Sequence, residues 1–308
     1  MLSTLLLLAQ VSATATAAQP IDTIVHPAWT PHRVYDADRG RWSDLESLAA
    51  EAARHDVVFF GEQHDDPGTH AIQRALLEAI ARRRPAILSL EMFERDVQPL
   101  VDGYLAGRLP EDSLLAAGRP WPRYRTDYRP AVEWARAQGW PVIAANIPRP
   151  IASAVARGGL GVIDTLGERR ALVAAEVSCP RNEYFKRFAE TMKGHVPGDS
   201  EAAKDAALER YYQAQCVKDE TMAESIVRAR ASVGGSALVV HLNGAFHSNY
   251  GLGTAERVKR RSPKAKLLVI TAIPVADLDA VKPSGDERKQ GAWLVYTLRP
   301  TADSLASR

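Results

Sequence analysis

The segment VVFFGEQHDD (residues 57–66) decides the fold, because it joins four apolar residues directly to a cluster of polar and ionisable side chains. A continuous apolar run of this length is typical of a strand buried on both faces, as in a parallel sheet covered by helices. Glu62 and His64 follow where this strand should end, so we expect them to face a ligand. Asp65 and Asp66 come next, in a position to cap a following helix.

Further apolar runs of similar length recur along the chain, each bounded by residues that favour turns. They are PAILSLEMF (85–93), PVIAANIP (141–148), SALVVHLNG (236–244), AKLLVITAIPV (265–275) and GAWLVYTLRP (291–300). Segments with helical spacing precede the second, third and fifth strands of the series, at 65–84, 128–140 and 253–261. The sequence therefore predicts an α/β fold with a mostly parallel sheet, flanked by helices and connected by right-handed crossovers.

Two intervals are too long to be simple crossovers. Residues 94–125 and 150–232 carry several additional helical patterns. We expect them to be helical insertions that form a smaller helical subdomain, or a lid over one edge of the sheet, within a single α/β domain spanning 19–308.

The N-terminal sequence MLSTLLLLAQVSATATAAQP has a short apolar run followed by small residues. This pattern predicts a signal peptide over residues 1–18 and an exported, periplasmic product. No cysteine lies near the expected cleavage point, so no lipid attachment is expected. No later segment approaches the roughly 20 apolar residues of a membrane span, so none is predicted.

The charge balance and the cysteine content narrow the possible functions. The chain has 39 Lys and Arg against 37 Asp and Glu, a balance that argues against nucleic-acid binding as its main work. Cys179 and Cys216 are the two cysteines, and both fall in segments with helical patterns. They could pair in an oxidising compartment or remain separate thiols. Neither has the spacing of a structural zinc site.

Polar side chains follow four of the predicted strands where each one ends. They are Glu62 and His64, then Glu91, then Asn146 and Arg149, and finally His241, Asn243 and His247. In a parallel sheet all of them gather outside the carboxyl ends of the strands, where α/β proteins bind ligands. Any one of them alone could be a capping or pairing residue. Their recurrence on four strands favours a shared site.

Glu62, His64, Glu91 and His247 form what we call the strand-end cluster. These residue types can bind a divalent ion such as zinc or manganese, which would activate water for hydrolysis. Alternatively, a His–Glu pair can act as a general base without metal. The stretch GEQH is not the helical His-Glu-x-x-His motif of zinc proteases, and no Gly-x-Ser-x-Gly elbow or phosphate loop is present.

The segment GRPWPRYRTDYRP (118–130) alternates aromatic and basic residues. Tyr124 and Tyr128 could stack on a flat ligand or bind haem iron, while arginines such as Arg129 could bind its carboxylates. The alternative is that this segment is only the start of a helix, stiffened by proline, with exposed arginines. A second segment, FAETMKGHVPGD (188–199), places His195 in a loop that either closes over the same site or is simply solvated.

Several ordered motifs give the chain a family resemblance. They are FFGEQHDDPGTH, LSLEMFERDVQ, DYRPAVEWARAQGWPVIAANIPR, AQCVKDETMA and VVHLNGAFHSNYGLGT, and together they cover roughly residues 45–272. On these motifs the sequence resembles the ChaN-like family of haem-binding, iron-regulated proteins. That family looks like a branch of a wider group that includes erythromycin esterases and Tiki/TraB proteins. GEQH, Glu91 and His247 match the pattern that the group shares.

The resemblance implies an exported protein that binds haem at the surface of a homodimer and serves haem and iron uptake with other components. We expect haem in an apolar cleft between the sheet mouth and the helical subdomain, with a tyrosine of 118–130 as iron ligand and His195 as competitor. The expected cofactor-binding residues are Tyr124, Tyr128, His195, Arg129, Asn146, Arg149 and Asn243. The alternative is a hydrolase of the erythromycin esterase or Tiki type that uses the strand-end cluster.

Overall fold

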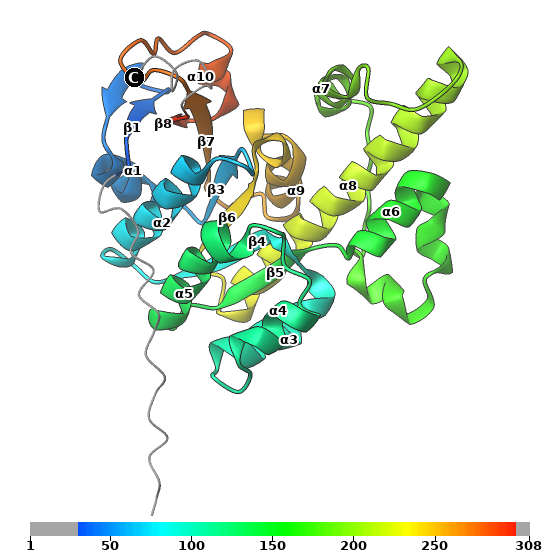
Figure 1. Cartoon of the computed structure of the whole chain (residues 1–308), viewed down its shortest axis with the longest axis horizontal. Coiled ribbons are helices and arrows are strands. Elements are labelled where there is room, and N and C mark those ends of the chain that lie inside the picture. The colour runs from blue at the N-terminus through cyan, green and yellow to red at the C-terminus, as the bar shows by residue number, and fades with distance from the viewer. Residues whose placement is uncertain (1–29, 300–308) are drawn as a thin grey trace, which may run out of the picture.

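An eight-stranded sheet forms the centre of the computed structural model, which describes residues 30–299 (Figure 1). Its strand order is β2-β1-β8-β7-β3-β6-β4-β5. The strands are β1 His32–Asp36, β2 Arg41–Ser43, β3 Val57–Glu62, β4 Ala86–Glu94, β5 Val142–Asn146, β6 Leu238–Gly244, β7 Leu267–Val275 and β8 Trp293–Leu298. The strands from β8 to β5 are parallel, and β1 and β2 add an antiparallel edge. The predicted α/β class and mostly parallel sheet are confirmed.

The central strand β3 lies between β6 and β7 in the sheet, and a layer of helices covers each face. It is therefore buried on both sides. Val58 and Phe60 pack toward α1 (Leu45–Ala52), α2 (Pro67–Ala81) and α5 (Arg129–Ala137). Val57 and Phe59 alternate to the other face, toward α8 (Glu201–Ser232) and α9 (Gly253–Arg261). This two-sided burial explains why the sequence of β3 is continuously apolar.

Helix α2 begins where the sequence predicts it. Asp66 is its N-cap and accepts a hydrogen bond from the backbone N–H of Thr69, and Pro67 occupies the first turn. The matching prediction for Asp65 is wrong, because its carboxylate forms an ion pair with Arg299 just after β8 instead. Cap and ion pair together fix the polar end of β3 against the neighbouring elements.

The first predicted insertion, 94–125, folds as the short helix η1 (Arg95–Val97), α3 (Gln98–Leu105) and α4 (Glu111–Ala117). The second contains α6 (Arg149–Gly158), the short helices η3 (Leu160–Thr165) and η4 (Gly167–Leu172), α7 (Glu183–Met192) and α8. The N-terminal half of α8 extends away from the sheet beside α6 and α7 (Figure 1). Its C-terminal half carries Ala223 and Ile226, which pack on the sheet. One continuous helix therefore joins the insertion to the sheet.

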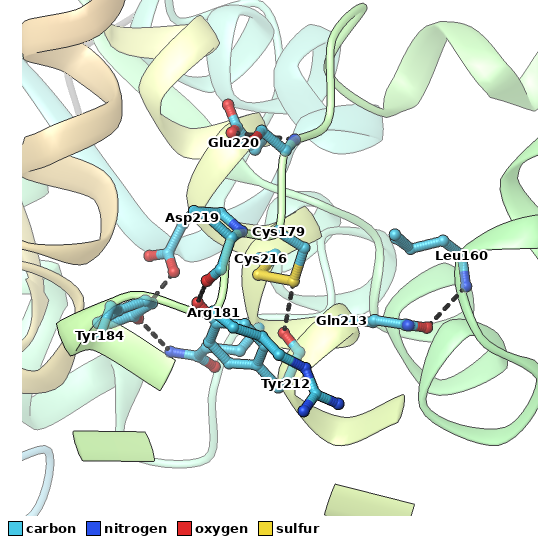
Figure 2. Close-up of a disulfide and its surroundings, with 12 residues drawn as sticks. Leu160, Cys179, Arg181, Tyr184, Tyr212, Gln213, Cys216, Asp219 and Glu220 are labelled. Atoms are coloured by element: carbon cyan, nitrogen blue, oxygen red, sulfur yellow. Dashed lines mark hydrogen bonds between the residues drawn. A yellow bond between two sulfur atoms is a disulfide. The ribbon is translucent and has the colours of Figure 1, made fainter. Parts of the chain in front are cut away.

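A disulfide joins Cys179 to Cys216, across 37 residues of chain (Figure 2). This answers the question that the sequence left open. Cys216 lies in α8, as expected. The helical prediction for Cys179 is wrong, because this residue lies in a segment without regular secondary structure, just before Pro180. A proline at that place lacks the N–H that a continuing helix needs. The bond fixes this segment against α8.

The predicted signal peptide, residues 1–18, lies outside the described residues. Between residues 30 and 299, no helix is both long enough and apolar enough to cross a bilayer.

Candidate functional site

The carboxyl ends of β3, β4 and β6 lie side by side, and they bring the strand-end cluster together. Glu62 ends β3, Glu91 lies near the end of β4, and His247 ends the short helix η5 (Ala245–His247) that follows β6. All three are buried, whereas 44% of the His64 side chain is exposed. The predicted gathering is therefore present, and His64 is the member that a ligand can reach.

Glu62 holds the exposed histidine in one orientation. Its Oε1 accepts hydrogen bonds from His64 Nδ1 at 2.9 Å and from the Tyr128 hydroxyl at 2.7 Å. Its Oε2 accepts a third from Gln73 Nε2 at 2.6 Å. A Cβ on Gly244 would lie 2.8 Å from His64 Nε2, so only glycine leaves room for this imidazole. His64 therefore presents Nε2 at the site while Glu62 binds the opposite nitrogen.

His247 lies between two buried carboxylates. Its Nε2 is 3.3 Å from Glu91 Oε1, and its Nδ1 is 2.6 Å from Asp219 Oδ1 on α8. The second oxygen of Glu91 accepts a hydrogen bond from the backbone N–H of Gly244 at 2.7 Å. This arrangement ties β4, β6 and α8 to a single imidazole.

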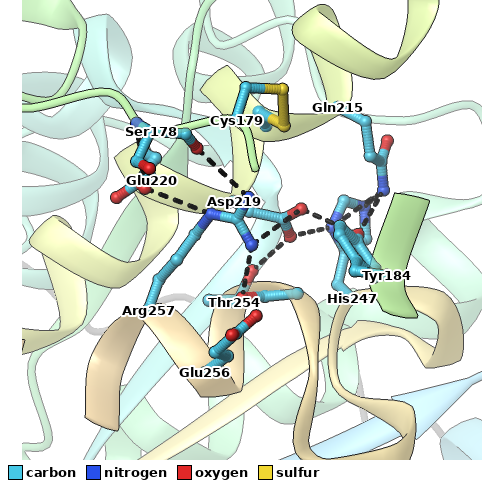
Figure 3. A network of polar contacts seen from close by, with 12 residues as sticks. Ser178, Cys179, Tyr184, Gln215, Asp219, Glu220, His247, Thr254, Glu256 and Arg257 are labelled. Atoms are coloured by element: carbon cyan, nitrogen blue, oxygen red, sulfur yellow. Dashed lines mark hydrogen bonds and ion pairs between the residues drawn. A yellow bond between two sulfur atoms is a disulfide. The ribbon is translucent and has the colours of Figure 1, made fainter. Parts of the chain in front are cut away.

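Asp219 was missed by the sequence analysis. It accepts hydrogen bonds from the Tyr184 hydroxyl at 2.7 Å and from Thr254 Oγ1 at 2.8 Å, with Arg257 Nη1 3.9 Å away (Figure 3). Its signal was the acidic pair Asp219–Glu220 inside AQCVKDETMA, one of the motifs that carry the family resemblance. A fully buried carboxylate requires partners of this kind.

The charges of the site follow from these contacts. Burial by itself opposes a charge on His247, but Glu91 and Asp219 outweigh it and raise its pKa to about 10. Burial raises the pKa of the two carboxyls, yet the facing His247 reverses the effect and holds both below their ordinary values. For His64, burial is likewise outweighed by the Glu62 hydrogen bond and by the Glu91 charge, which raise its pKa.

His241 and the two asparagines are buried and bind residues other than the side chains of the strand-end cluster, although His241 Nε2 and Asn243 Oδ1 have no hydrogen-bond partner among the described residues. Burial lowers the pKa of His241 to about 4, and its Nδ1 contacts Ser89 Oγ at 2.9 Å. Asn146 donates to the backbone oxygen of Glu91, and Asn243 donates to the backbone oxygen of Gly244. Arg149 is exposed at the start of α6. The structure thus gives none of them a contact with the strand-end cluster side chains.

The tyrosines of 118–130 are not at the surface. Tyr124 is 2% exposed and packs on Phe93, and Tyr128 is 1% exposed with its hydroxyl on Glu62. A π-helical turn, η2 (Tyr124–Tyr128), directs both rings into the core. This corrects the expectation that one of them meets a haem iron. Arg129 is occupied by an ion pair with Glu111.

No three His, Cys, Asp or Glu residues within 30–299 are arranged to hold a metal ion. The strand-end carboxylates and imidazoles bind one another instead, as the Glu62–His64 and Glu91–His247 contacts show. The geometry therefore gives the metal-ligand assignment of Glu62, His64, Glu91 and His247 no support, and it stays a prediction.

A pocket of about 240 Å³ lies between α7 and the segment that follows β6. We call it the aromatic pocket; it is lined by Tyr184, Arg187, Glu190, Thr191, Phe246, Asn249, Tyr250 and Leu252. The rings of Tyr184 and Phe246 are 5.1 Å apart, and the Arg187 guanidinium lies 3.5 Å from the Tyr250 ring centroid. His195 is exposed just beyond the end of α7. Of the lining residues, Glu190 and Thr191 fall in the segment 188–199 that the sequence analysis singled out. Phe246, Asn249, Tyr250 and Leu252 fall in the motif VVHLNGAFHSNYGLGT, but none of the eight was named singly as a ligand-binding residue.

The paired His247 predicts a stability optimum in mild acid. Its raised pKa contributes stability that is complete below about 6.5 and is lost as pH rises toward about 10. The lowered pKa values of Glu91 and Asp219 contribute stability that is lost as pH falls through the acid range. Urea unfolding should therefore show a decline on the order of 3 kcal/mol between pH 6 and pH 9.

The variant His247→Gln should be less stable at pH 6 and should lose most of the alkaline decline. His55→Gln, which alters a histidine remote from the site, serves as the control. Wild-type and His247→Gln curves that fall in parallel between pH 6 and pH 9 would contradict the charge assignment.

Solved structures share this fold. The structure of "Cofacial heme binding to ChaN of Campylobacter jejuni" aligns with a TM-score of 0.65 at 17% identity, over 86% of this chain and 96% of that one. A mutant of the erythromycin esterase EreC in its open conformation aligns at 0.45 with 13% identity, over 85% and 82% of the two chains. The first likeness shows the fold, and the second is too weak to support an argument.

A curated plant protein matches in sequence. Protein RETICULATA-RELATED 5, chloroplastic, from Arabidopsis thaliana is 25% identical over 230 residues, which is 71% of this chain. The chain spans 31% of the length of that relative.

The family follows from a match that covers most of the described chain. Residues 48–258 match the sequence model of the family described as "Haem-binding uptake, Tiki superfamily, ChaN". That range includes the whole strand-end cluster, Asp219 and the aromatic pocket. It also confirms the resemblance drawn from the sequence motifs. The chain belongs to the ChaN haem-binding family of the Tiki superfamily.

Proposed function

We propose that this protein binds haem at the aromatic pocket and serves haem and iron uptake in the cell envelope. The observation that supports the proposal most is this pocket, which combines aromatic walls with a cation in a chain of a haem-binding family. It lies between the helical insertion and the mouth of the sheet.

The residues around the pocket suit a porphyrin. Phe246 and Leu252 offer apolar surface, and Arg187 can pair with a propionate. His195 is an exposed imidazole three residues beyond the end of α7, outside the pocket lining, and imidazole is a common axial ligand of haem iron. Bound haem would supply an iron centre with a free coordination position. The residues therefore fit the group.

The size of the pocket favours partial enclosure. Its volume of about 240 Å³ is below the roughly 300–1,000 Å³ typical of sites that enclose a small molecule. Much of a porphyrin would remain exposed, so a second copy of the chain would cover it in a homodimer. The structure of the Campylobacter jejuni ChaN is described as binding haem cofacially, which supports haem as the ligand in this proposal.

Export is part of the proposal. The sequence of residues 1–18 has the pattern of a signal peptide. The Cys179–Cys216 disulfide is typical of oxidising compartments such as the periplasm. Partners that deliver or receive haem there would be other components of uptake.

Hemin titration tests the haem site. Wild-type protein should give a saturable shift of the Soret band, and His195→Ala should weaken hemin affinity by about tenfold or more and change the band position, because the axial ligand is lost. Arg187→Ala should weaken affinity severalfold without moving the band.

Two controls separate the ligand assignment from the proposal as a whole. Tyr124→Phe and His32→Ala, the latter on the edge strand β1, should leave the spectrum unchanged. An unchanged spectrum for His195→Ala would overturn the ligand assignment. No Soret shift with wild-type protein would overturn the haem-binding function itself.

A second candidate function is supported by the geometry of His64. It is exposed, Glu62 holds its Nδ1, and no described residue occupies its Nε2 by a hydrogen bond. Such a dyad can remove a proton from a water molecule while the water oxygen attacks an ester or peptide carbonyl. The metal-free form of the hydrolase hypothesis is the one that this geometry favours.

Hydrolysis of p-nitrophenyl esters tests this candidate. His64→Ala should abolish turnover, and Glu62→Gln should lower kcat by about 100-fold, since general-base catalysis contributes about 10²–10⁴. Activity should rise with pH through a midpoint above 6.5, because the pKa of His64 is raised and the neutral form is the base. Turnover that survives in His64→Ala would rule out this site, and His32→Ala is the matched control.

A further inference from the structure

Tyr184 and Asp219 connect the aromatic pocket to His247 of the strand-end cluster. The ring of Tyr184 lines the pocket, and its hydroxyl donates to Asp219, which in turn binds His247 Nδ1 (Figure 3). Gln215 Nε2 lies 3.1 Å from the Tyr184 hydroxyl and 3.3 Å from His247 Nδ1. One tyrosine thus lines the aromatic pocket and also binds Asp219, the carboxylate that is paired with His247.

The segment after β6 makes a second connection between the two sites. Phe246, in the pocket wall, directly precedes His247. Leu252 lies two residues before Thr254, whose hydroxyl donates to Asp219. Between them Gly253 has φ +58°, and a Cβ there would lie 2.6 Å from the carbonyl oxygen of His247. Only glycine therefore allows the backbone at residue 253 to lie this close to the backbone of His247.

Helix α7 closes the pocket from the other side through one cation–π contact. Arg187 lies over Tyr250, which has a left-handed backbone (φ 62°) and donates a hydrogen bond to Asp286 at 2.8 Å. A planar ligand entering between α7 and this segment must separate Arg187 from Tyr250 or shift α7. Tyr184 is on α7, so a shift of this helix changes the position of the Tyr184 hydroxyl at Asp219.

We propose that Tyr184 couples the aromatic pocket to the strand-end cluster, so that haem binding and the state of the Asp219–His247 pair influence each other. The inference rests on the proposed haem site and adds a regulation of it. Such coupling is reciprocal, because a ligand that changes the pair must bind differently when the pair is altered. The aromatic pocket and the strand-end cluster then behave as one coupled system.

The charged and titratable groups around His247 come from every element packed against it. They are Glu91 on β4, Asp219 on α8, Tyr184 on α7, Arg257 on α9, His64 after β3 and His241 on β6. Of these, Tyr184 alone also lines the aromatic pocket. Its hydroxyl is therefore the group whose removal should uncouple the two sites while the aromatic wall remains.

A double-mutant cycle on hemin affinity tests the coupling. The four proteins are wild type, Tyr184→Phe, Asp219→Asn and the double variant. Asp219→Asn should change the hemin Kd about fivefold or more in the wild-type background, the lower end of usual allosteric couplings. In the Tyr184→Phe background the same change should alter Kd less than about twofold.

Matched variants keep the test decisive. Tyr212→Phe removes a buried tyrosine hydroxyl that donates to the backbone oxygen of Pro180, so its effect should add independently to that of Asp219→Asn. If Asp219→Asn does not fold, Thr254→Val removes a milder contact to the same carboxylate and replaces it in the cycle. Additive Kd changes for Tyr184→Phe would overturn the coupling alone. Absence of hemin binding to wild-type protein would overturn the proposed function and the coupling together.

Discussion

The structure depends on the placement of one buried imidazole between two buried carboxylates. His247, Glu91 and Asp219 come from three separate elements, and each would be costly to bury alone. Their pairing requires α8 to cross the sheet at the carboxyl ends of β4 and β6. Glu220, the next residue of α8, is also a buried and paired charge, because it forms ion pairs with Arg257 and two further arginines of α9. Charge pairing thus fixes the helical insertion to the sheet.

The strand-end cluster and the aromatic pocket differ in their chemical character. The strand-end cluster is satisfied internally and leaves only His64 partly exposed, which suits proton transfer better than the binding of a large ligand. The aromatic pocket is lined by aromatic and polar side chains, among them Arg187 and Glu190. The aromatic rings and Arg187 suit a flat ligand with a carboxylate. Asp219 and Tyr184 lie between them. The haem function proposed above assigns haem to the pocket, and the second candidate function assigns hydrolysis to His64 in the cluster.

Much of the fold could be predicted from the sequence because its signals are local. Each of the six parallel strands is a short, mainly apolar run, and β3, β4 and β6 are buried on both faces. Asp66 with Pro67 marks the start of α2. The edge strands β1 and β2 were missed, since short, partly exposed strands lack that pattern. Helix α8 gave a mixed signal because it packs on the insertion at one end and on the sheet at the other.

The candidate site was predicted in part for the same reason. Strand ends are visible in a sequence, so Glu62, Glu91 and His247 could be brought together by the parallel topology alone. Asp219 could not, because it lies in the middle of helix α8, where no strand end marks its position. The inward rotation of Tyr124 and Tyr128 depends on a π-helical turn, which no spacing of aromatic residues distinguishes from an exposed stretch.

The location of haem iron is the most direct test of this account. A crystal structure of the protein with hemin, with iron located by anomalous scattering, should place the metal beside His195 and the porphyrin over Phe246 and Leu252. Iron at His64, or at any position away from α7 and the segment 246–252, would contradict the account.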